Sequence, residues 1–263
     1  MKFAISNLAW RYDEERRSLS LLRRKGIVGV EIAPTLVWPE WKGLNITTAR
    51  RYASYLEDLG FEIPCLQSIF FGKNFGSIFD ERNHNNILCH LDFVADIAAA
   101  LCAKTVVFGS PRVRQFIDGP MDHAPDIAVP FLQKATEHFH NRDINLCLEP
   151  CSREYKCDFI NTHSELLQLI EIVDRPRFGL HIDAGNLHET GEMLSNILAY
   201  GRPVCHFHIS EPGLTGFKAS LAPHLENLTI LRECLYQGWV SIEMLRSDGK
   251  LSSALPLHLI DST

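Results

Sequence analysis

Residues 178–192 read FGLHIDAGNLHETGE, and the change from apolar to polar residues within this stretch decides the fold. It contains a short apolar run, Gly179 to Asp183, with the length and composition of a buried strand. The run ends on the carboxylate of Asp183, and the chain continues into a polar segment with Asn186 and His188, which we expect to be a loop. The same succession, a short strand and then a polar segment, recurs along the chain.

Eight short strands are predicted, and a helical pattern separates each from the next. They are Lys2–Ser6, Val28–Ala33, Glu62–Gln67, Thr105–Phe108, Asn145–Glu149, Gly179–Asp183, Val204–His208 and Trp239–Glu243. Such alternation is typical of a parallel (β/α)8 barrel. A doubly wound open sheet usually has a glycine-rich turn after its first strand, which FAISNLAWRYD (residues 3–13) lacks. We therefore predict an α/β fold, with residues 1–263 forming one (β/α)8 TIM-barrel domain.

Composition limits the partners and the compartment. The chain has 26 Lys and Arg against 32 Asp and Glu, a formal net charge of −6, which disfavours nucleic acid and anionic membrane surfaces. No apolar run approaches the roughly 20 residues that a membrane span requires. The eight cysteines lie mostly inside or beside apolar runs, as reduced buried thiols do. We therefore expect a cytoplasmic protein with no nucleic-acid or membrane partner.

Four consecutive predicted strands end in polar side chains that can bind a metal ion. The ends are Glu149 in INLCLEP, Asp183 in FGLHIDAG, His208 in VCHFHIS and Glu243 in VSIEML. Because the carboxyl ends of barrel strands meet at one mouth, these side chains should lie together. Three carboxylates so close need a compensating positive charge. We predict one divalent cation, Mn²⁺ by preference, with Mg²⁺, Co²⁺ or Zn²⁺ as alternatives, because oxygen ligands and one imidazole suit these ions.

Further residues are expected around this site. The two-residue period of a strand places His181 and His206 on the faces of Asp183 and His208, one layer deeper, where they should hold the ligands in place. Asn186 is expected to support the ligands in the same way. Predicted substrate contacts near strand ends are Glu31, Gln67, Arg112 and His188.

The chain resembles the xylose isomerase-like (β/α)8 superfamily, in particular its sugar isomerase and epimerase branch with the ketose 3-epimerases. The resemblance rests on LEP at Glu149, HIDAGN at Asp183, HFHISE at His208 and VSIEM at Glu243, with FAISNLAW and GVEIAP in support. It implies that these four residues bind one divalent cation and that the two glutamates move the proton. It also adds Glu154, in EPCSREY, as a substrate contact, one place earlier than the usual second glutamate.

The predicted function is a metal-dependent isomerase or epimerase of sugars or sugar phosphates, acting by proton transfer through an ene-diolate. An inosose-type dehydratase shares that chemistry and is the main alternative. An apurinic-site endonuclease is disfavoured by the acidic charge and by Asn186, which stands where the endonucleases have a histidine ligand. A non-catalytic sugar-binding barrel is the remaining alternative. The expected partner is a small carbohydrate, and many members of the superfamily are homo-oligomers.

Overall fold

The structure, a computed structural model, describes residues 1–116, 123–217, 220–246, 251, 255, 256 and 259. An eight-stranded sheet in the order β2-β1-β8-β7-β6-β5-β4-β3, with every ladder parallel, forms its centre. The strands are β1 (Lys2–Ser6), β2 (Gly29–Glu31), β3 (Cys65–Leu66), β4 (Thr105–Phe108), β5 (Asn145–Leu148), β6 (Phe178–Asp183), β7 (Val204–Ser210) and β8 (Trp239–Glu243). Isolated bridges between the segments of β2 and β3 bring the two sheet edges together. The predicted (β/α)8 barrel is confirmed.

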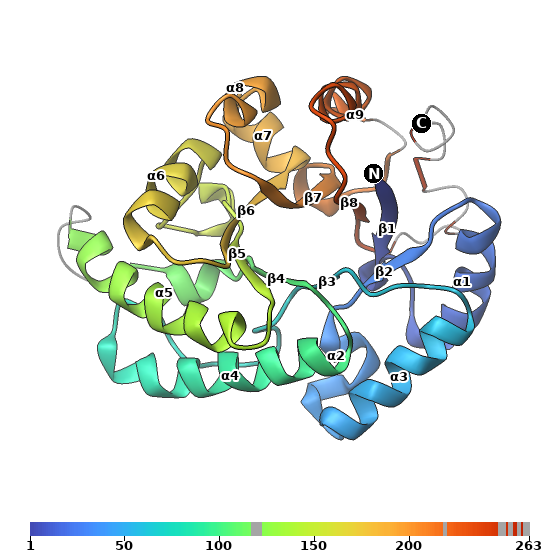
Figure 1. Cartoon of the computed structure of the whole chain (residues 1–263), viewed down its shortest axis with the longest axis horizontal. Coiled ribbons are helices and arrows are strands. Elements are labelled where there is room, and N and C mark those ends of the chain that lie inside the picture. The colour runs from blue at the N-terminus through green and yellow to red at the C-terminus, as the bar shows by residue number, and fades with distance from the viewer. Residues whose placement is uncertain (117–122, 218–219, 247–250, 252–254, 257–258, 260–263) are drawn as a thin grey trace.

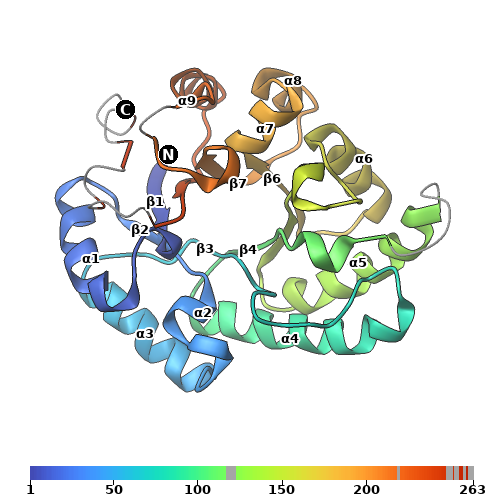
Figure 2. The same cartoon turned by 180° about the vertical axis from the view of Figure 1, so that it is seen from behind.

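Helices surround the strands on the outside of the ring (Figure 1), and the view from behind shows the same arrangement (Figure 2). The α-helices are α1 (Glu15–Arg24), α2 (Pro34–Val37), α3 (Ile46–Asp58), α4 (His84–Ala100), α5 (Ala124–His140), α6 (His163–Val173), α7 (Ala184–Thr190), α8 (Leu194–Leu198) and α9 (His224–Glu233). Short 3-10 turns include η5 (Pro111–Arg114), η7 (Arg153–Tyr155) and η8 (Pro212–Leu214). Among the described helices, none combines the length and the apolar character needed to cross a bilayer.

Two strands are much shorter than predicted, and β5 ends one residue early, at Leu148. β2 covers Gly29–Glu31 and β3 only Cys65–Leu66, whereas the sequence pattern extended both. Pro64 lies inside the predicted third strand and has no N–H to donate to a ladder. The backbones still pair on either side of it, because Val30 N–H donates to Glu62 O at 2.9 Å and Gln67 N–H donates to Ile32 O at 2.9 Å.

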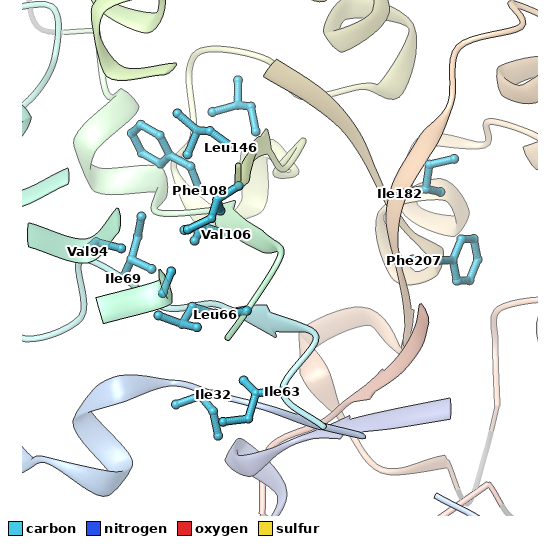
Figure 3. Close-up of a cluster of buried hydrophobic side chains, with 14 of the residues drawn as sticks. Ile32, Ile63, Leu66, Ile69, Val94, Val106, Phe108, Leu146, Ile182 and Phe207 are labelled. Carbon is cyan, nitrogen blue, oxygen red and sulfur yellow. The ribbon is translucent and has the colours of Figure 1, made fainter. Parts of the chain in front are cut away.

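The apolar core lies between the sheet and the helices. Side chains of one parity along the strands, such as Leu66, Phe108, Leu146, Ile182 and Phe207, are buried in this layer (Figure 3). Because successive strand residues point to opposite faces, the other parity points into the barrel. That set is largely polar, and it is the set that the candidate site uses.

Candidate metal centre

The four predicted ligands converge at the carboxyl ends of β5 to β8. Ligand atoms of Glu149, Asp183, His208 and Glu243 all lie within 4.8 Å of one another. His208 Nδ1 is 3.1 Å from Glu243 Oε2, 3.8 Å from Asp183 Oδ2 and 3.7 Å from Glu149 Oε1. The strand register explains this, since Asp183 pairs with His208 and the next inward residue of β7, Ser210, pairs with Glu243. The structure therefore brings together all four residues at one point.

The carboxylates crowd negative charge into a buried place. Burial and the charge of Glu149 raise the pKa of Asp183. Burial, together with the charges of Glu149 and Asp183, raises the pKa of Glu243 to about 7 even though His208 opposes this. Burial also acts to raise the pKa of Glu149, but the imidazoles of His181 and His208, whose nitrogens lie 3.5 and 3.7 Å from Glu149 Oε1, outweigh it, and that pKa is lowered. The cluster thus has more negative charge than it can hold ionised, and a divalent cation would relieve it.

Glu31 anchors the imidazole of His208 from below. His208 Nε2 is 3.0 and 3.1 Å from the two carboxylate oxygens of Glu31, and His206 Nε2 is 3.3 Å from Oε2. Burial opposes ionisation of Glu31, but the charges of His208 and His206 lower its pKa well below the usual value, so it accepts as a carboxylate. The Nε2–H of His208 is thereby directed to Glu31, which leaves Nδ1 facing the three carboxylates. Among the described residues, Nδ1 forms no well-aligned hydrogen bond, although it lies 3.1 Å from Glu243 Oε2, so its place among the carboxylates suits a shared metal ion.

His181 and His206 lie one layer deeper than the cluster. The two rings stack with centroids 5.7 Å apart, and His181 Nε2 is 3.5 Å from Glu149 Oε1. Burial and the nearby charge of His208 lower the pKa of His181 to about 3, so it is neutral. Both histidines lie where the two-residue period placed them.

Asp183 is held from three directions, and sequence reasoning identified only one of them. Asn186 N–H donates to Asp183 Oδ1 at 2.7 Å, in line with its expected supporting place. The hydroxyl of Ser210 donates to Asp183 Oδ2, and the backbone N–H of Asp183 donates to His163 Nε2 at 3.2 Å. Ser210 lies two residues after His208 on the same strand, so the two-residue period could have predicted that it faces the cluster. His163 has no such signal, because its place depends on how α6 packs.

A cavity of about 210 Å³ lies over the cluster, and Glu149, Asp183 and Glu243 line it. Gln67 and Asn186 also line this cavity, whereas His208 lies below it, at the floor. Further lining residues that the sequence analysis did not select are Ser110, Cys151, Ser152, Tyr155, Glu189 and Glu211. Its wall is thus mainly neutral or acidic.

Four predicted substrate contacts do not line this cavity. Glu31 is fully buried below His208. Arg112 lines a separate cavity of about 150 Å³ beside Lys73. Glu154 is exposed on η7, whose neighbours Ser152 and Tyr155 line the cavity in its place. His188 is exposed because the expected loop after Asp183 is helical from Ala184, and the helical period turns Gly185 and Glu189 toward the cavity instead.

Comparison with known proteins identifies the family. The sequence profile described as xylose isomerase-like TIM barrel matches residues 19–258, which is most of the chain. The chain belongs to the xylose isomerase-like TIM barrel family.

One sequence relative of this chain is named as an epimerase. An L-ribulose 3-epimerase from Methylomonas sp. (strain DH-1) is 29% identical over 133 residues, which span 49% of this chain and 46% of the relative. The match therefore covers about half of each protein.

Solved structures of similar fold include the 3-keto-D-glucoside 4-epimerase YcjR from E. coli, with a TM-score of 0.81, 16% identity and full coverage of both chains. The IolI protein, whose structure contains a zinc atom, has a TM-score of 0.72 and 17% identity, over 100% of this chain and 95% of that one. These likenesses show the shared barrel fold.

Proposed function

We propose that this protein is a divalent-cation-dependent isomerase or epimerase of sugars. The observation that carries the proposal is the convergence of three carboxylates and His208 Nδ1, within 4.8 Å of one another, at the floor of an open cavity. The names of the relatives support an activity on sugars, and the zinc atom in the IolI structure supports a cation in a barrel of this fold.

The donor set fits one cation. Glu149, Asp183, His208 and Glu243 would hold it. The Nδ1 of His208 faces the three carboxylates, and together with their surplus of negative charge it gives the donor set that such a site requires. Oxygen donors with one imidazole favour Mn²⁺ in this proposal. When bound, a cation supplies a Lewis acid that polarises a substrate carbonyl and makes the neighbouring C–H more acidic.

The protein's own contribution is to place two carboxylates on different sides of the substrate. Glu149 follows β5 and Glu243 ends β8, with β6 and β7 between them in the sheet. One carboxylate removes the proton from the carbon next to the carbonyl, giving an ene-diolate. The other returns a proton to the opposite face of that carbon, which is epimerisation, or to the adjacent carbon, which is isomerisation. Proton transfer by positioned groups of this kind contributes about 10² to 10⁴-fold to the rate.

Asp183 and His208 have positioning tasks in this scheme. The bonds from Asn186 N–H and the Ser210 hydroxyl fix the orientation of the Asp183 carboxylate, and Glu31 fixes the ring of His208. Gln67, whose Nε2 donates to Ser6 Oγ at 2.8 Å, presents a polar group on the cavity wall that can contact a sugar hydroxyl.

Solvent exchange tests the proposal. The protein is stripped with a chelator, reloaded with Mn²⁺ and incubated in D₂O with a panel of ketoses and with inosose. We expect deuterium at the carbon next to the carbonyl and formation of the epimer or the aldose. The variants Glu149→Gln and Glu243→Gln should lose at least about a hundredfold in exchange rate.

Glu57→Gln, a change of an exposed carboxylate on α3, serves as the matched control and should keep full activity. Loss of water from inosose without epimer formation would assign the dehydratase instead. Sugar binding with no exchange in any substrate would identify a non-catalytic barrel and overturn the proposal.

A further inference from the structure

A buried imidazole without a hydrogen-bonding role lies directly below the carboxylate cluster. His181 is fully buried in β6, and neither its Nδ1 nor its Nε2 forms a well-aligned hydrogen bond with a described residue. His206, its neighbour in the same layer, instead contacts Glu31 Oε2 through Nε2 at 3.3 Å. An unpaired buried polar atom is costly, and bound ions are among the partners that account for such atoms in native proteins.

The unpaired ring of His181 faces Glu149. His181 Nε2 lies 3.5 Å from Glu149 Oε1, and His208 Nδ1 lies 3.7 Å from the same oxygen. The rings of His181 and His208 meet edge to face, with centroids 4.3 Å apart and an interplanar angle of 78°. One ligand atom from each of Glu149, His181 and His208 lies within 4.8 Å of the other two. These three residues therefore form a second donor set, which shares Glu149 and His208 with the first.

The two donor sets differ in charge, in donor type and in depth. The first has three carboxylates and one imidazole, whereas the second has one carboxylate and two imidazoles. Carboxylate oxygens suit Mg²⁺ and Mn²⁺, and imidazole nitrogens suit Zn²⁺ and other late first-row cations. Glu149, Asp183 and Glu243 line the cavity, while His181 and His208 are fully buried beneath it. The second set is thus deeper and richer in nitrogen.

We propose that His181 is a further metal ligand, which together with Glu149 and His208 gives the centre a second, deeper position for Zn²⁺ or a similar nitrogen-preferring cation. The inference rests on the proposed function, because that function requires a cation at the neighbouring position. Since the two positions share two ligands, they are alternatives for one cation. Mn²⁺ takes the upper position with three carboxylates, and Zn²⁺ takes the deeper one, which leaves Asp183 and Glu243 without the cation.

X-ray absorption spectroscopy counts the imidazoles on the bound cation. The whole protein is stripped with a chelator and loaded with one equivalent of Zn²⁺ or of Mn²⁺, and the extended fine structure is recorded at the edge of each metal. A bound imidazole ring gives a characteristic multiple-scattering pattern. We expect two imidazoles on Zn²⁺ and one on Mn²⁺. One imidazole on Zn²⁺ in the unmodified chain overturns the proposal.

Variants identify the second imidazole. His181→Leu removes the donor and should leave one imidazole on Zn²⁺, with the affinity for Zn²⁺ lowered at least about tenfold and that for Mn²⁺ kept within about threefold. His140→Asn, at an exposed position of α5, is the matched control and should keep both affinities. If circular dichroism shows that His181→Leu is unfolded, His181→Asn, which keeps a polar side chain, takes its place.

Two results with a folded His181 variant contradict the proposal. Two imidazoles still bound to Zn²⁺ would assign the second one to His206. Equal losses of affinity for Zn²⁺ and Mn²⁺ would mean that His181 only supports the packing of the centre.

The same measurements separate this inference from the proposed function. If the unmodified chain binds both cations through His208 alone, the deeper position is ruled out and the proposed function stands. If two imidazoles hold Zn²⁺ but the Mn²⁺-loaded protein exchanges no proton in any substrate, only the proposed function falls. A chain that binds neither cation overturns both.

Discussion

Replacing Glu31 by glutamine should weaken the binding of a divalent cation by about 10 to 100-fold, although Glu31 would not contact the cation. Its carboxylate accepts from His208 Nε2 at 3.0 and 3.1 Å and from His206 Nε2 at 3.3 Å, and it is fully buried. Glutamine keeps one acceptor oxygen but turns an NH₂ group toward one of these imidazoles. His208 then loses the negative partner that holds its Nδ1 toward the cation.

The magnitude follows from the bond that is lost. A hydrogen bond to a charged group contributes about 1.5–3 kcal/mol net. Since each 1.4 kcal/mol changes an equilibrium constant tenfold, losing one such bond corresponds to roughly one to two powers of ten in the dissociation constant. Glu31→Asp keeps the charge with a shorter side chain, and its loss should therefore be smaller than that of Glu31→Gln.

Isothermal titration with Mn²⁺ measures the effect, with circular dichroism to verify that each variant is folded. Glu62→Gln is the control, because the side chain of Glu62 makes an exposed ion pair with Lys2 next to the same strands and the change should leave the affinity unchanged. A folded Glu31→Gln protein that binds Mn²⁺ within twofold of the unmodified chain would refute the role given to Glu31. Equal losses in Glu31→Asp and Glu31→Gln would refute the importance of its charge.

Three further outcomes are expected. First, removal of the cation with a chelator should lower the melting temperature, because a cation at a hundredfold excess over its Kd stabilises the native state by about 2.7 kcal/mol. The melting temperature of His208→Asn should not change when Mn²⁺ is added. Second, burial acts to raise the pKa of Glu192, but hydrogen bonds from His163 and Ser164 lower that pKa to about 2 in the folded protein. The ionised Glu192 therefore stabilises the fold at pH values above the pKa of the carboxyl in the unfolded chain. This stabilisation is lost as the pH falls toward the pKa in the folded protein. From about pH 5 to about pH 3 the unmodified chain should therefore lose roughly 2 kcal/mol more than Glu192→Gln in urea unfolding, and parallel losses would contradict this. Third, a Cβ on Gly29 would lie 2.5 Å from the Trp239 ring and 2.7 Å from the Cβ of Ala4, so Gly29→Ala should cost about 1–3 kcal/mol, whereas exposed Ser54→Ala on α3 should stay within about 0.5 kcal/mol.

The barrel and its central cluster could be predicted because their signals are local. Alternation of short apolar runs with helical patterns predicted the eight strands, and the two-residue period within a strand placed His181 and His206 below Asp183 and His208. Parallel strands in register then bring their ends together without any knowledge of side-chain packing. The extents of β2 and β3 were predicted too long, since Pro64 interrupts the ladder.

The sequence by itself therefore determined the parallel barrel and which strand ends share its mouth, because the period of a strand and the repeat of strand and helix are properties of neighbouring residues. Only the tertiary structure decided that Glu31 binds His208 across 177 positions, that His163 holds the backbone of Asp183, and that Arg114 contacts Cys151. It also turned Arg112, Glu154 and His188 away from the cavity. These contacts depend on how the barrel closes and on the paths of the connecting segments. Pairings between residues far apart in the chain produce no periodic pattern in the sequence.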